Sequence, residues 1–123
     1  MSMQEVFGEV ISTYSSDEAC NDGVLIDLRP IIGHKDIFNY VTNNLMGQGY
    51  LKQNEANQDY IDRANLVDLL QQARKIVKNR SKNFMQMDTF FAGRIELPNG
   101  KRTKIFIVQN ETGKYTLMLP EDY

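Results

Sequence analysis

Apolar and polar residues alternate along the last third of the chain, and this alternation predicts three antiparallel strands joined as a meander. The expected strands cover residues 90–97, 102–109 and 114–119. Turn segments rich in Pro, Asn and Gly separate them at residues 98–100 and 110–113. The alternation gathers apolar side chains on one face, so we expect that face to pack on the hydrophobic core.

Helical spacing of apolar residues precedes the meander. Between residues 57 and 79, apolar side chains recur every three or four positions from Ile61 to Val77, which predicts the longest helix. Residues 35–46 show the same spacing and predict a second helix. The glycines that follow it, Gly47 and Gly49, are expected to end that helix.

A short helix is predicted near the N-terminus. Ser15 and Glu18 have the spacing of a capping box, and Gly23 can adopt the left-handed conformation that ends a helix. Residues 24–28 are expected to follow as a short strand, and residues 6–12 are either an opening strand or a docking segment. The pattern leaves open whether either segment joins the sheet.

Together these elements predict one α+β domain over residues 1–123, with a helical part at about 15–82 and the meander at about 84–119. Its sheet is expected to be small, mainly antiparallel and three- or four-stranded, with helices packed on one face. A chain of 123 residues with 41% hydrophobic residues can bury a core without a metal or disulfides. The sequence leaves the oligomeric state open between a monomer and a homodimer.

Cysteine usage and apolar segments indicate the compartment. Cys20 is the only cysteine, so no intrachain disulfide can form, and a reducing compartment is the simpler interpretation. No apolar stretch approaches the roughly 18 residues that span a bilayer, and residues 1–9 lack the pattern of a signal peptide. We therefore expect a cytoplasmic protein without a membrane partner.

Few residues suggest catalysis. His34 is the only histidine, which excludes zinc sites built from several histidines, and it could pair with Cys20 only if the fold joined them. One cluster of acids lacks the spacing of a calcium loop: Asp17, Glu18, Asp22 and Asp27. We therefore predict no catalytic residues, no metal and no cofactor. A small hydrolase or transferase that uses these residues is the enzyme alternative.

Charge is distributed unevenly along a chain whose net charge is −2. Residues 1–73 hold eleven acids and four bases, whereas residues 74–104 hold nine bases and two acids. Such asymmetry can steer an acidic partner to one surface. The alternative is that an acidic layer of the chain packs on a basic one.

Basic and aromatic side chains are expected to share the face of the meander that points away from the core. Strand alternation places Arg94, Arg102 and Lys104 there, with two phenylalanines, and the end of the long helix can extend the patch. The candidate partner-binding residues are Lys78, Arg80, Lys82, Phe90, Arg94, Arg102, Lys104 and Phe106. This combination can bind an acidic protein surface or single-stranded nucleic acid, although no RNA-recognition signature is present.

The two ends of the chain carry a further signal. Residues 10–19 contain Tyr14 next to the Ser15 cap, residues 22–28 begin with Asp-Gly and continue as a short apolar run, and residues 115–122 end in Leu-Pro and two acids. These segments resemble an uncharacterised family of small proteins encoded on plasmids, conjugative elements and phages. The family has no assigned activity or site residues, so the resemblance implies only the setting of a mobile-element accessory protein.

The functional expectation combines these observations. We expect a non-enzymatic accessory protein of a phage or plasmid that binds a host or element macromolecule, with inhibition of a host system as one form. The expected partner is a protein with an acidic surface. The alternative is a nucleic-acid-binding module that uses the basic region from Arg74 to Lys104.

Overall fold

The fold is built on a five-stranded sheet with the strand order β1-β2-β7-β6-β5. The computed structural model describes residues 15–80 and 89–123. The strands are β1 (Leu25–Asp27), β2 (Phe38–Thr42), β5 (Phe90–Glu96), β6 (Arg102–Gln109) and β7 (Tyr115–Met118). Only β2 and β7 pair in parallel among these strands. The α+β class and the mainly antiparallel sheet are confirmed; the sheet has five strands because both β1 and β2 join it.

The C-terminal meander agrees closely with the alternation in the sequence. β6 covers the predicted residues 102–109, and β5 and β7 end within one residue of the predicted bounds. Phe91 pairs with Ile107, and Ile107 pairs with Leu117, so these apolar side chains share one face. The segment 6–12 lies outside the described residues.

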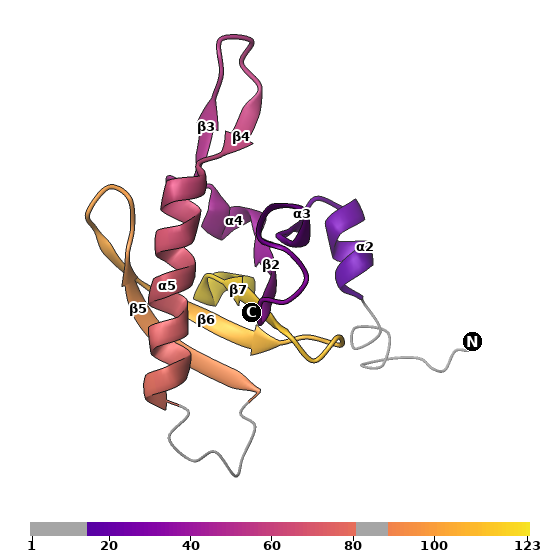
Figure 1. The fold of residues 1–123 in the computed structure, drawn as a ribbon, viewed down its shortest axis with the longest axis vertical. Helices are drawn as coiled ribbons and strands as arrows, with labels where there is room; N and C mark the ends of the chain where they lie inside the picture. The colour runs from indigo at the N-terminus through magenta and orange to yellow at the C-terminus, as the bar shows by residue number, and fades with distance from the viewer. Residues whose placement is uncertain (1–14, 81–88) are drawn as a thin grey trace.

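Helix α5 (Arg63–Arg80) covers that apolar face, in front of β5 and β6 in Figure 1. It contacts β5 closely, because Gly93 leaves room for the side chain of Ile76. The helix, β2 and the meander share one hydrophobic cluster. Its fully buried members include Phe38, Val41, Leu45, Leu66, Leu69, Ala73, Ile95, Ile105 and Leu117.

The predicted helix 57–79 is wrong at its start. Residues before Arg63 form a separate hairpin of β3 (Leu51–Gln53) and β4 (Asp59–Ile61), which projects from the body in Figure 1. Asp62 then begins the helix, since its carboxylate accepts hydrogen bonds from the next free backbone N–H groups, at 3.1 and 3.2 Å. The N-cap at Asp62 therefore sets where α5 begins.

The predicted helix 35–46 is also wrong. Residues from Phe38 to Thr42 form β2, and only the short α4 (Asn43–Met46) is helical. All five β2 residues are buried between β1 and β7, so the strand lacks the alternation of a half-exposed one and its apolar residues resemble helical spacing. Buried Asn39 is satisfied because it bonds to side chains of the β6–β7 turn.

Three shorter helical segments complete the described structure. α2 (Ser16–Asn21) has the predicted Ser15–Glu18 capping box, α3 (Arg29–Ile32) packs two isoleucines against the core, and η1 (Pro120–Asp122) is a final 3-10 turn. α2 lies far from α5, at the other side of the molecule (Figure 1). Among the described helices, none has the length and apolar character needed to cross a bilayer.

We predict that Gly93→Ala destabilises the fold by about 1–3 kcal/mol, because an added Cβ would lie 2.7 Å from Ile76 Cδ1 and 2.8 Å from its Cγ1. Chemical denaturation measures the change. The cost should fall in an Ile76→Ala background, where those atoms are absent. Gly47→Ala is the control, since its Cβ would meet nothing closer than 3.5 Å and its φ is −70°. Equal effects of Gly93→Ala in both backgrounds would contradict this packing.

Candidate functional site

The face of β5 and β6 that points away from α5 carries three cations in neighbouring positions. Because Gly93 faces the helix, the alternate residues of β5 and their partners on β6 face the other way. Arg94 pairs with Lys104 across the strands, and Arg102 lies two residues before Lys104 on the same face. All three side chains are exposed, and they border a shallow hollow of about 580 Å³.

Three aromatic rings lie beside these cations. Phe90 and Phe106 meet edge to face with their centroids 4.8 Å apart, and Tyr123 contacts both rings at 5.3 and 5.6 Å. Lys104 Nζ lies 5.6 Å from the centroid of Phe106, within reach of a cation–π interaction. We call the six residues the basic–aromatic face: Phe90, Arg94, Arg102, Lys104, Phe106 and Tyr123.

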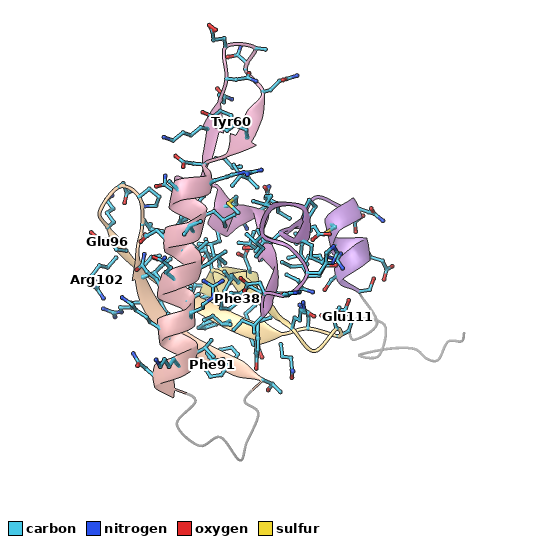
Figure 2. All side chains as sticks on the ribbon, viewed as in Figure 1. Phe38, Tyr60, Phe91, Glu96, Arg102 and Glu111 are labelled. Carbon is cyan, nitrogen blue, oxygen red and sulfur yellow. The ribbon has the colours of Figure 1, made fainter. Side chains whose placement is uncertain are left out.

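None of the three cations of this face forms an ion pair with a residue in the described part of the chain. In residues 15–80 and 89–123, the ion pairs are Arg29–Asp27, Lys52–Asp62 and Arg74–Asp36. Glu96 is the cross-strand neighbour of Arg102, yet no ion pair joins them there. Figure 2 shows both residues at the hairpin end of the strands, well away from Glu111. With three cations and one acid, the described part of this face carries a net positive charge.

The structure brings together five of the eight predicted residues: Phe90, Arg94, Arg102, Lys104 and Phe106. Lys78 is exposed on α5, which covers the other face of the sheet, so it does not join them. Arg80 is the last residue of the same helix, and Lys82 lies outside the described residues.

Sequence reasoning missed Tyr123, which η1 places on the two phenylalanine rings. Asp122 holds that turn: its carboxylate accepts hydrogen bonds from Thr42 Oγ and Asn44 Nδ2, both at 2.7 Å, and from the Leu119 N–H at 3.2 Å. The only local signal was Leu-Pro followed by two acids, which is typical of a helical start. It could predict the turn but not where the turn packs.

A second hollow lies on the same side of the sheet, between α2 and η1. Its volume is about 270 Å³. Apolar side chains line it together with polar ones; they include Ala19, Val24, Leu25, Val108, Met118, Ser16, Thr42, Thr116, Glu111 and Asp122. We call it the α2–η1 cavity.

Glu111 attaches α2 to the sheet beside this cavity. Its carboxylate accepts hydrogen bonds from the Ser16 N–H at 3.0 Å and the Ser16 hydroxyl at 2.9 Å. Burial raises the pKa of Glu111, but the hydrogen bonds from the Ser16 N–H, its own backbone N–H and the Ser16 hydroxyl leave that pKa below its ordinary value. The ionised carboxylate is therefore the form that holds the helix.

Two of the residues considered for catalysis make separate structural contacts. Glu18 completes the capping box, and Asp27 binds Arg29 through both carboxylate oxygens. The hydrogen bond from Arg29 holds the pKa of Asp27 below its usual value. Within the described ranges, no group of three or more His, Cys, Asp or Glu side chains is placed to hold a metal.

Comparisons with family models, curated proteins and solved structures found no match to this chain.

We predict that Glu111→Gln destabilises the protein at neutral pH and that the difference from the wild type disappears in acid. A folded-state pKa below 4.5 means that the ionised carboxylate contributes stability above pH 4.5 and loses it as the pH falls through the folded value. Denaturation of both proteins between pH 7 and pH 3 measures this. Glu55→Gln, on the projecting hairpin, controls for loss of a charge. A difference for Glu111→Gln that stays constant with pH would contradict the prediction.

Proposed function

We propose that this protein is a non-enzymatic binding module that docks an acidic surface of another protein on its basic–aromatic face. The observation that carries the proposal is the placement of Arg94, Arg102 and Lys104 beside exposed aromatic rings, with no ion pair from these cations to a described residue. Phe90 is 40% exposed and Tyr123 is 75% exposed, although both are large apolar rings. Burial of such large exposed rings by a partner contributes a favourable hydrophobic free energy to binding.

The chemistry of the face suits a protein partner. Arginine and aromatic side chains are enriched among the residues that contribute most to protein–protein binding. Three cations with one neighbouring acid, Glu96, leave a net positive charge, which raises the rate of encounter with an acidic surface and disfavours basic partners. The rings supply apolar area, and the cations supply orientation.

A nucleic-acid partner is the second candidate, because cations and aromatic rings on one strand face can also bind single strands. Two observations favour the protein partner. The net charge of the chain is −2, and nucleic-acid-binding domains are usually strongly basic. The three rings also pack edge to face on one another, an arrangement that differs from a row of parallel stacking platforms.

The setting we propose is that of a phage or plasmid accessory protein acting on a host or element macromolecule. The resemblance of residues 10–19, 22–28 and 115–122 to mobile-element proteins supports this setting. Inhibition of a host system is one form that such binding takes. The chemistry of the face supports the binding itself independently of that setting.

We predict that reversing the three cations, as Arg94→Glu, Arg102→Glu and Lys104→Glu together, removes a stoichiometric protein partner. The reason is that each substitution replaces an attraction for acidic groups with a repulsion. The measurement is isolation of the tagged protein from the cells that encode it, at low salt and after nuclease treatment. Mass spectrometry identifies what is retained.

The matched control reverses three exposed cations outside this face, Lys35, Arg63 and Lys75, and so produces the same change in net charge. We expect this control to keep the partner. Full retention of the partner by the first variant, when it is folded, would contradict the proposal. Recovery of nucleic acid alone, lost with nuclease and with rising salt, would replace it with the nucleic-acid function.

A further inference from the structure

Side chains along one face of β6 change from basic to apolar in a regular order. Arg102 and Lys104 come first, Phe106 follows, and Val108 comes last. On β5 the cross-strand neighbours are Glu96 opposite Arg102, Arg94 opposite Lys104 and Phe90 opposite Val108, so β5 also runs from charged to apolar residues, with one acid at its charged end. The face is therefore polarised along the strand direction.

The apolar end of this gradient opens into the α2–η1 cavity. Val108 is part of the cavity lining, whereas Arg102 and Lys104 line the basic hollow at the other end. A volume of about 270 Å³ lies below the roughly 300–1,000 Å³ of small-molecule pockets. A cavity of this size can accommodate one bulky side chain of a partner.

At one position, the edge of β5 is already occupied by a side chain of α5. Strand addition needs an unpaired sheet edge, and the edge strand β5 is already engaged at Glu96. There the Gln72 side chain accepts from the Glu96 N–H at 2.7 Å and donates to the Glu96 carbonyl at 3.0 Å. Sheet faces, in contrast, are commonly covered by amphipathic helices. α5 already does this on the opposite face.

The length of the gradient sets the length of the partner segment. From Arg102 to Val108 the strand advances six residues, or about 20 Å at roughly 3.4 Å per residue. A helix covers that distance in about 13 residues, at a rise of roughly 1.5 Å per residue. Three to four helical turns therefore span the distance from the basic hollow to the cavity, across Tyr123, which packs on Phe90 and Phe106 between them.

We infer that the partner presents an amphipathic helix of three to four turns, with acidic residues at one end that contact Arg94, Arg102 and Lys104, and a bulky apolar residue at the other end that enters the α2–η1 cavity. This inference rests on the proposed function, since it uses the same face, and it adds the kind of segment and its direction along β6. The cavity provides an observation independent of the cations.

The test uses two hydrocarbon-stapled helical peptides of 14 residues. The polarised peptide has three glutamates in its first turn and one phenylalanine and one leucine in its last, with alanine and glutamine elsewhere. The control peptide has the same composition with the glutamates and apolar residues interspersed. Binding to the full chain is measured by NMR titration. We expect the polarised peptide to bind at least about fivefold more tightly, which corresponds to roughly 1 kcal/mol.

A pair of valine variants tests the cavity separately from the cations. Val24 is 48% exposed and lines the cavity, whereas Val67 is 47% exposed on α5. We expect Val24→Gln to weaken the polarised peptide about three- to tenfold and Val67→Gln to leave its affinity unchanged.

Equal affinity of the two peptides, the absence of binding by either, or the same response to both valine variants would overturn the inference. If Val24→Gln has no effect while reversal of Arg94, Arg102 and Lys104 still removes the protein partner from cells, the helix-and-cavity inference fails and the proposed function stands. If charge reversal also leaves the partner in place, both fail.

Discussion

The packing of α5 on β5 is the contact on which the rest of the structure depends. Gly93 has no side chain, and the space above it is filled by Ile76, so the helix lies close to the sheet. The packing of α5 on β5 buries Phe91, Ile95 and their partners on β6 and β7. It also determines that the alternate residues face away from the helix, because side chains of a strand point to opposite faces. The basic–aromatic face is the consequence of where α5 packs.

Two carboxylates shape what lies on that second face. Glu111 binds the first residue of α2, and Asp122 binds Thr42 and Asn44 across a long sequence separation. One fixes a wall of the α2–η1 cavity, and the other fixes the turn that places Tyr123 on the phenylalanine rings. Both use ionisable groups at hydrogen-bonding distance, so the geometry of this face is coupled to charge as well as to apolar packing.

The meander and its two faces could be predicted because each strand is half-exposed and therefore alternates. β6 has its predicted bounds for this reason. β2 could not be recognised, since burial of all five residues removes the alternation. The β3–β4 hairpin was missed because its polar residues carry little apolar signal, and Asp62, not the earlier periodicity, begins α5. Tyr123 depends on bonds to residues about 80 positions earlier, which no local pattern records.

The most direct measurement of net positive charge on the basic–aromatic face needs no partner. Amide proton relaxation is recorded by NMR with an anionic and, separately, with a neutral gadolinium chelate of similar size. Attraction of the anion to Arg94, Arg102 and Lys104 predicts a higher anionic-to-neutral ratio at their amides than on the β3–β4 hairpin, where Glu55 and Asp59 are exposed. Equal ratios at the two places would contradict the account, because the cations would then be neutralised within the protein.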